Sequence, residues 1–459
     1  MKKRQHVMLA LTVAASITAL TACGGGSGNN TAQNADFGSE PTGTLKIWGF
    51  NNADDVGTSR LDYAAEQLEG VDIEQDNGSF DAQKFTALAA SNGLPDAVQM
   101  DRNFVGTYAA KGLLMSLDEC YSENDVDPDE AYYPQVIDDV TYDGKVYAVP
   151  QFYQPPAIML NMRVLNAAGV SPDAFDTSNR EGLLAAIQTL YKESGGNPTT
   201  LGFDPRVPGQ AGIWLLGNGG QIMDEDGKPT LDDPANIDAV EFMKQMMDAQ
   251  GGYAKIKSFI DSFDMFGDNN QFVADQVAAE LIEQWYVNVV ATTAPNVEIS
   301  AVPFRDKDGN PFTVASGTAF VIPKGAKNPA AACAWALNLT STDGWMAAGE
   351  ARAANIEKEE GRLNTGLFTG SPEADQMIRE EFVGSTGIPG FDEAINTYYE
   401  VASEGKSFGI SAAGQEIQTE LQNAITAALL GEKSPEEAMA DGQAAALRAW
   451  ETTTGENSE

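Results

Sequence analysis

Residues 44–50, TLKIWGF, begin with alternating polar and apolar side chains, which is the pattern of a half-buried β-strand. A helical stretch at 59–68 follows, and then a second strand at 71–74, a second helix at 82–90 and a third strand at 97–100. Strands that alternate with helices in this way form a parallel sheet with helices on both faces. This stretch therefore predicts an α/β fold.

Three polar turns separate strand-like segments further along the chain. In VTYDGKVYAVP (residues 140–150), the pair Asp143-Gly144 predicts a two-residue hairpin turn. MDEDGKPT (223–230) and FRDKDGNPF (304–312) contain Asp-x-Asp-Gly fragments like those of calcium loops. Because neither fragment is followed by the correctly spaced Glu of an EF-hand, we interpret both as turns and expect no metal site.

The N-terminus has the layout of a secretory signal. Basic residues at 2–4 precede an apolar run at 7–20, and small residues then lead to Cys23. The apolar run is too short to span a bilayer comfortably. The segment LTAC (20–23) resembles the bacterial lipobox, which implies that residues 1–22 are removed and that Cys23 becomes the lipid-modified first residue.

Charge and histidine content exclude several classes of function. The net charge is -39, with 67 acidic against 28 basic residues, so nucleic acid and anionic lipid head groups are repelled and neither is expected as a partner. The only histidine is His6, which lies inside the signal. The mature chain therefore lacks a histidine for a catalytic triad, a metal site or imidazole proton transfer.

After Cys23, only Cys120 and Cys333 remain. Exported proteins often pair such residues, and two unpaired buried thiols are an equally good interpretation of the sequence. The mature chain is too long for one small core, so we expect two lobes.

Several segments occur together in an order known from one family. They are LKIWGF (45–50), LPDAV (94–98) with YAAKGLL (108–114), VTYDGKVYAVP (140–150), LN (160–161) with AGV (168–170), and GTAFVIP (317–323) with a helical run at 330–339. In this order they resemble the extracellular solute-binding proteins of carbohydrate ABC importers, the class that includes the maltose-type binding proteins. The resemblance covers nearly all of residues 43–450, and VTYDGKVYAVP is its most specific part.

The resemblance implies a two-lobed α/β fold of the periplasmic-binding-protein type, in which each lobe is a sheet flanked by helices and the solute lies in the cleft between the lobes. The implied divisions are a signal (1–22), a flexible tether from Cys23 (23–42), lobe one (43–150 plus 318–341), lobe two (155–314 plus 345–459), and crossovers near 151–154, 315–317 and 342–344. Closure of the lobes on the solute would be a hinge motion. Residues 171–183, SPDAFDTSNREGL, depart from the family pattern, which weakens any assignment of the particular substrate.

A sugar offers an apolar face that stacks on aromatic rings and hydroxyls that bind planar polar groups. Strand ends and crossovers are where an α/β sheet presents such groups. The candidates in lobe one and at the crossovers are Trp48, Asn51, Asp101, Arg102, Phe152, Tyr153, Ser316 and Gly317. Core packing explains Trp48 equally well, and a surface charge pair explains Asp101 and Arg102 equally well.

Two segments of lobe two supply the remaining candidates. The first, LGFDPRVPGQAG (201–212), is a loop bounded by Pro and Gly and contains Phe203, Asp204 and Arg206. The second contains Glu283, Gln284, Trp285 and Tyr286. The resemblance places an aromatic sugar platform at Trp285 and Tyr286, and Trp285 is the strongest candidate for stacking.

We therefore expect a lipid-anchored receptor on the outer side of the membrane, without catalytic residues, cofactor or metal. It would act as a monomer, capture an oligosaccharide or glycoside, and deliver it to the permease of an ABC transporter. One alternative is a binding protein of the same architecture for a peptide or a polyamine, since Asp101 and Glu283 suit a cation. The other is a secreted glycoside hydrolase that works through two carboxylates.

Overall fold

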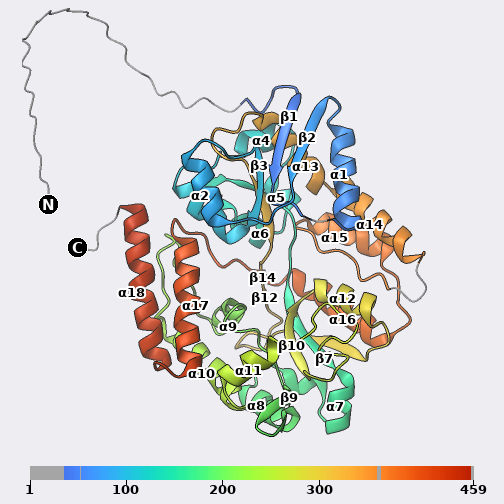
Figure 1. Ribbon diagram of the computed structural model, residues 1–459, viewed down its shortest axis with the longest axis vertical. Coiled ribbons are helices and arrows are strands. Elements are labelled where there is room, and N and C mark those ends of the chain that lie inside the picture. The colour runs from blue at the N-terminus through green and yellow to red at the C-terminus, as the bar shows by residue number, and fades with distance from the viewer. Residues whose placement is uncertain (1–35, 52, 359–362, 456–459) are drawn as a thin grey trace, which may run out of the picture. The chain divides into compact units, whose positions relative to one another are not determined.

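The computed structural model describes residues 36–51, 53–358 and 363–455 (Figure 1). The predicted signal, Cys23 and the tether as far as residue 35 lie outside the described residues. In the described ranges, no helix is both long enough and apolar enough to cross a membrane.

The first lobe is built on a five-stranded sheet. Its strands, in spatial order, are β2 (Val71–Asp76), β1 (Gly43–Trp48), β3 (Ala97–Asp101), β13 (Thr318–Val321) and β6 (Ala148–Pro150). β1 pairs in parallel with β2 and β3, whereas β13 is antiparallel to β3 and to β6. The predicted parallel strand–helix alternation of the N-terminal stretch is confirmed.

Helices of the first lobe cover this sheet and continue beyond it (Figure 1). They are α1 (Asp55–Gln67), α2 (Ala82–Ala90), η1 (Arg102–Phe104), α3 (Val105–Ala110), α4 (Asp118–Glu123), α5 (Pro128–Ala131), α6 (Pro134–Asp138) and α13 (Pro329–Thr340). Asp96, in the Pro-Asp turn before β3, connects β3 to β1 and to the start of α13. Its carboxylate accepts hydrogen bonds from the backbone of Lys46 at 2.9 Å and of Lys327 and Asn328 at 2.7 and 2.9 Å. The buried Asp96 therefore fixes the start of α13 against β1.

The second lobe is built on a three-stranded antiparallel sheet. Its strands, in order, are β10 (Ala279–Glu283), β7 (Pro156–Asn161) and β11 (Ile299–Val302). The surrounding helices are α7 (Met162–Ala168), η2 (Pro172–Phe175), α8 (Arg180–Leu190), α9 (Ala211–Gly217), α10 (Pro234–Asp248), α11 (Tyr253–Ile260), α12 (Trp285–Thr293), α16 (Pro389–Ala402), α17 (Gly414–Leu430) and α18 (Pro435–Thr454). All six residues of β7 are buried, because helices cover both faces of this central strand.

Three short strand pairs complete the fold of the described residues. Two are hairpins, β4 (Thr141–Tyr142) with β5 (Lys145–Val146) and β8 (Lys192–Ser194) with β9 (Asn197–Thr200). The third joins distant parts of the chain, because β12 (Thr313–Val314) pairs in parallel with β14 (Gly405–Lys406). The hairpin predicted at Asp143-Gly144 is confirmed, with φ of 50° and 68° at these two residues. Asp224 and Asp306 bind backbone N–H groups of their own turns, as expected for turns. The described residues contain no cluster of acidic, cysteine or histidine side chains that could hold a metal ion.

A disulfide links Cys120 of α4 to Cys333 of α13, with their Cα atoms 5.8 Å apart. Both residues are completely buried. The sequence left open whether they pair, and the structure shows that they do.

The predicted division of the chain differs from the structure after residue 341. α14 (Thr342–Ile356) and α15 (Pro372–Phe382) lie beside α1 and not in the second lobe (Figure 1). Trp345 of α14 and Ile378 of α15 share a buried cluster with Val56 of α1. The chain therefore crosses between the lobes after α15, and not near 342–344, because the apolar faces of α14 and α15 are buried against α1.

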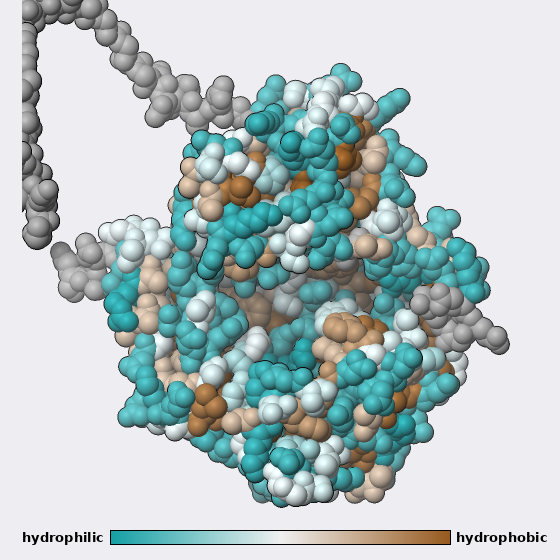
Figure 2. Space-filling model, viewed as in Figure 1, coloured by the Kyte–Doolittle hydropathy of each residue, from teal (hydrophilic) through white to brown (hydrophobic). Residues whose placement is uncertain are grey.

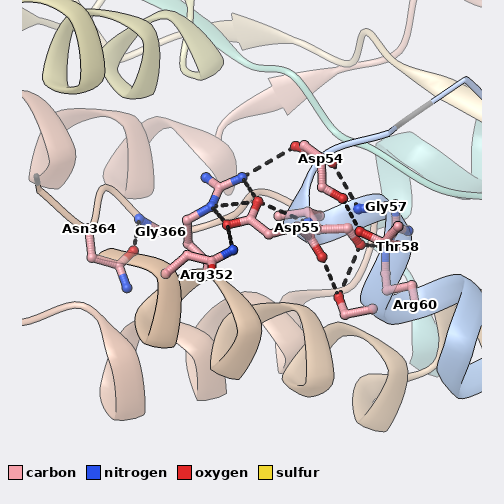
Figure 3. A network of polar contacts seen from close by, with 11 residues as sticks. Asp54, Asp55, Gly57, Thr58, Arg60, Arg352, Asn364 and Gly366 are labelled. Carbon is pink, nitrogen blue, oxygen red and sulfur yellow. Dashed lines mark hydrogen bonds and ion pairs between the residues drawn. The ribbon is translucent and has the colours of Figure 1, made fainter. Parts of the chain in front are cut away.

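A charged network fastens α14 to the beginning of α1 (Figure 3). The guanidinium of Arg352 donates to both oxygens of Asp55, at 2.7 and 2.8 Å, and to Asp54 at 3.3 Å. Burial would raise the pKa of Asp55, but the hydrogen bonds and charge of Arg352 outweigh this effect and lower it. The fully buried Arg60 guanidinium lies 3.8 Å from the ring centroid of Trp345. These contacts make α14 part of the first lobe.

Candidate binding cleft

A cavity of about 270 Å³ lies where the ends of β3 and β10 approach the crossovers, and Figure 2 shows the surface hollowed between the two lobes. Its walls come from both lobes, from two crossovers and from the C-terminal segment. They are formed by Asp101, Arg102, Asn103, Asp139, Gln154, Gly209, Gln210, Ile222, Met223, Glu283, Ala315, Ser316, Gly317, residues 408–411, Gly414, Gln418 and Gln422. Three carboxylates and five carboxamides are among them, beside the apolar side chains of Ile222, Met223, Phe408 and Ile410.

Arg102 and Asp139 form the wall of the first lobe. Arg102 is only 2% exposed, its Nε lies 3.4 Å from Asp139 Oδ2, and its Nη1 donates to the carbonyl of Phe152 at 2.7 Å. Its Nη2 is buried and has no hydrogen-bond partner. Burial raises the pKa of Asp139 to about 6, although the charge of Arg102 lowers it. This wall therefore contains one ion pair, Arg102 with Asp139, and one N–H donor without a partner among the described residues, Arg102 Nη2.

Asp101 and Glu283 bring carboxylates to the cavity from opposite lobes. Desolvation at the wall raises the pKa of Asp101, and the charge of Arg102 partly opposes this effect. Glu283 accepts a hydrogen bond from the side chain of Gln210, while its Oε2 is buried without a partner. A buried acceptor without a partner is costly in a folded protein, so a solute that supplies a donor here gains binding energy.

The two crossovers meet at Gly317. Its φ is +149°, and a Cβ at this position would lie 1.9 Å from the carbonyl oxygen of Phe152 and 2.7 Å from Arg102 Nη1. Only glycine fits there. The adjacent Ser316 donates its hydroxyl to the carbonyl of Gln154 at 2.9 Å. The crossovers are thus held side by side at the floor of the cavity.

A charged cluster lies buried in the second lobe behind this wall. Glu280, which is fully buried, accepts from Arg206 at 3.2 Å and from Gln271 at 2.8 Å. Burial and the neighbouring Asp204 raise the pKa of Glu280 to about 8, and Arg206 opposes them. Arg206 is therefore the counterion of two buried carboxylates, those of Asp204 and Glu280.

This cluster predicts a pH dependence of stability. Because the pKa of Glu280 is raised on folding, its ionisation costs stability, which is lost as the pH rises from about 4.5 to about 8. We expect Glu280→Gln, which does not ionise, to reduce the fall in the free energy of unfolding between pH 5 and pH 8. Urea denaturation at four pH values measures this slope. Equal slopes for the variant and the parent protein would contradict the prediction.

The structure brings five of the fifteen predicted site residues to the cavity walls. These are Asp101, Arg102, Glu283, Ser316 and Gly317. Gln284 does not line the cavity; it is 9% exposed and has a side-chain oxygen without a partner. Of the other aromatic and charged candidates, most are core residues. Those in the core are Trp48, Tyr153, Phe203, Asp204 and Tyr286.

Four predicted residues lie outside the walls without being part of the core. Asn51 is exposed and donates to the hydroxyl of Ser79 at 3.3 Å. Phe152 packs edge-on against Trp345, and Arg206 binds Glu280 as described. Trp285 begins α12, and the ring of Phe266 is stacked on it at 5.9 Å.

The sequence did not predict that residues in the C-terminal segment 408–422 line the cavity. The loop 407–413 and the first turns of α17 reach the first lobe, where the backbone of Gln415 donates to the hydroxyl of Thr107 at 3.2 Å. Gln418 and Gln422 are four residues apart and share one face of α17. This spacing and the sequence of the loop, SFGISAA, were the signals that the sequence offered.

Comparison with known proteins agrees with this architecture. A family model described as bacterial extracellular solute-binding protein matches residues 62–353. The fold is similar to that of CpMnBP1 with mannotriose bound, at a TM-score of 0.71 and 22% identity over 88% of this chain and 99% of that one.

Two further solved structures have the same fold. They are the ABC substrate-binding protein Lmo0181 from Listeria monocytogenes in complex with cycloalternan (TM-score 0.70, 17% identity, 90% of this chain and 99% of that one) and the sugar-binding protein MalE from Xanthomonas citri (0.68, 16%, 89% and 98%). The two-lobed α/β fold expected from the sequence is confirmed. Since the family model covers most of the described chain, the protein belongs to the bacterial extracellular solute-binding proteins.

Proposed function

We propose that this protein is the solute receptor of an ABC importer and that its solute is a carbohydrate held between the lobes. One observation carries the proposal: carboxylate, carboxamide and guanidinium groups from both lobes face one cavity, and two of them have unpartnered atoms, Arg102 Nη2 and Glu283 Oε2. Planar polar groups of this kind bind neighbouring hydroxyls. The saccharides named for the similar structures support the same class of solute.

In this proposal, Asp101 and Arg102 bind hydroxyls from the first lobe and Glu283 binds them from the second. A solute that bridges the two walls stabilises the closed arrangement of the lobes, with Ser316 and Gly317 at the crossover. Lipidation at Cys23 would hold the receptor at the outer face of the membrane, where it would pass its solute to the permease.

The carboxylates of Asp101 and Glu283 also suit a second class of solute. Asp101 and Glu283 come from opposite walls, and the side chain of Asp101 has no hydrogen-bond partner among the described residues. A solute with two protonated amines, such as a polyamine, could join them. It would bind without any requirement for hydroxyls.

A thermal-shift screen of the full chain tests the proposal, with mono- and oligosaccharides as probes and peptides and polyamines as controls. A ligand at a hundred times its dissociation constant adds about 2.7 kcal/mol of stability, so binding raises the melting temperature visibly. We expect a response to saccharides. A response to polyamines alone would replace the carbohydrate proposal, and hydrolysis of a bound glycoside would contradict the receptor role.

We expect Glu283→Gln to weaken saccharide binding by about tenfold, or about 1.4 kcal/mol, because a hydrogen bond to a charged acceptor is replaced by a neutral one. Glu66→Gln is the matched control, because Glu66 is exposed on α1 and does not line the cavity. Titration calorimetry with the best saccharide of the screen measures both. Equal affinity of the two variants would remove Glu283 from the site.

A further inference from the structure

A second cavity adjoins the binding cavity in the second lobe. It measures about 520 Å³ and lies between the turns at 223–230 and 304–312. Ile222, Met223, Phe408 and Gly409 line both cavities, so the two share a wall. The second cavity is therefore next to the binding cavity, and these four residues form the border between them.

Phe408 is fixed at the border of the two cavities. A Cβ added to Gly212 would lie 2.2 Å from Phe408 Cε1, so the ring lies directly against the backbone of α9. Ser407 anchors the loop from the other side, because its hydroxyl donates to Asp139 at 2.5 Å and accepts from the backbone of Gly409 at 2.9 Å. The half-buried ring of Phe408 is therefore held in place before any solute binds.

Among the residues that the structure describes, Phe408 is the only aromatic one in the wall of the binding cavity. Trp285, the platform expected from the family resemblance, lies outside both cavities, and the ring of Phe266 is already stacked on it with an interplanar angle of 17°. A sugar ring inside the cleft can thus find its stacking partner in Phe408.

The second cavity also carries groups that bind hydroxyls. Glu225 and Lys406 line it, both are exposed, and neither side chain has a hydrogen-bond or ion-pair partner within the described part of the chain. A carboxylate and an ammonium group in the wall of one open space suit a neutral, hydroxyl-rich solute.

We propose that the second cavity continues the binding site, so that the solute is an extended saccharide with units on both sides of Phe408. This inference rests on the proposed carbohydrate function and adds a minimum length to it. Phe408 stacks against one sugar ring of the saccharide at the border between the cavities. The second cavity binds the sugar units beyond that ring.

Calorimetric titration of the full chain with ladders of malto- and manno-oligosaccharides, from one to six units, tests the inference. We expect affinity to rise with chain length in the parent protein. The double variant Glu225→Ala/Lys406→Ala should bind the shortest members as the parent does and lose severalfold affinity for the longest. Phe408→Ala should lose about tenfold or more, and Phe408→Tyr should retain most of the affinity. Phe266→Ala is the matched control, since Phe266 is 66% exposed and lines neither cavity.

The possible failures are distinguishable. If short and long saccharides bind equally well and the double variant behaves like the parent, the second cavity is not part of the site, although the carbohydrate function stands. If Phe266→Ala loses affinity and Phe408→Ala does not, the sugar stacks at Phe266, which lies on Trp285 of α12, and the inference is overturned. If no saccharide of any length binds, the carbohydrate function and the inference that rests on it both fail.

Discussion

Replacing both Cys120 and Cys333 by serine is expected to lower the free energy of unfolding by about 2–5 kcal/mol. The bond joins residues 213 positions apart, so it restricts a very long loop of the unfolded chain. In the folded state it fastens α4 to α13, and both sulfur atoms are buried. Guanidinium denaturation of the double variant and of the parent protein measures the difference.

Reduction provides the control for this prediction. Dithiothreitol should lower the melting temperature of the parent protein and leave that of the double variant unchanged, because Cys23 is then the only cysteine left. Equal stability of the parent protein and the double variant would show that the core of the first lobe holds α4 and α13 together without the bond.

The first sheet could be predicted from the sequence because its signals are local. Alternating side chains, Pro95 and Gly93 define β3 and the helix before it without any distant contact. The position of α14 could not be predicted in this way. It depends on Arg352 reaching Asp55, almost three hundred residues earlier in the chain, and on Trp345 meeting Arg60.

The difference between local signals and distant contacts also explains which cleft residues could be predicted. Asp101 was predicted because it follows the last buried residue of β3, and strand ends meet at the cleft. Glu283 was predicted because it adjoins the segment where the family resemblance places an aromatic platform, and in the structure it ends β10. The aromatic candidates were less predictable, because the type of side chain does not reveal whether it points to the core. Trp48 packs under Phe80 and Lys84, and Phe203 packs against Trp214. Both are large apolar rings that the fold needs for its interior.

The position of Phe408 at the cleft could not be predicted from local sequence patterns. It follows a two-residue strand, and only the pairing of that strand with Thr313 and Val314 carries it to the cleft. A family motif order that ends before residue 340 contains no information about this pairing. The contribution of the C-terminal segment to the cleft therefore became visible only in the structure.

We expect Arg102→Met to be strongly destabilising near neutral pH and above. Arg102 is the only counterion of the buried Asp139 carboxylate among the described residues, and breaking a buried ion pair from one side costs about 3–5 kcal/mol. Urea denaturation without solute measures the effect on stability apart from the effect on binding.

The loss should depend on pH in a defined direction. Burial raises the pKa of Asp139 to about 6 even with Arg102 present, so its ionisation costs stability as the pH rises from about 4 through 6. Removing the guanidinium raises the pKa of Asp139 further. The pH range over which ionisation of Asp139 destabilises the fold then extends to higher pH. The destabilisation should therefore be small at pH 5, where Asp139 takes up a proton, and full at pH 8.

A second substitution separates charge from packing. In Arg102→Met/Asp139→Asn the carboxylate is gone, while Ser407 can still donate to the carboxamide oxygen as it now donates to Asp139 at 2.5 Å. This double variant should regain most of the stability lost at pH 8 by Arg102→Met alone. An equal loss at pH 5 and pH 8, without rescue, would mean that Arg102 acts through its hydrogen bond to the Phe152 carbonyl and through packing at the crossover. The unpaired charge of Asp139 would then have no measurable part in the stability of this wall.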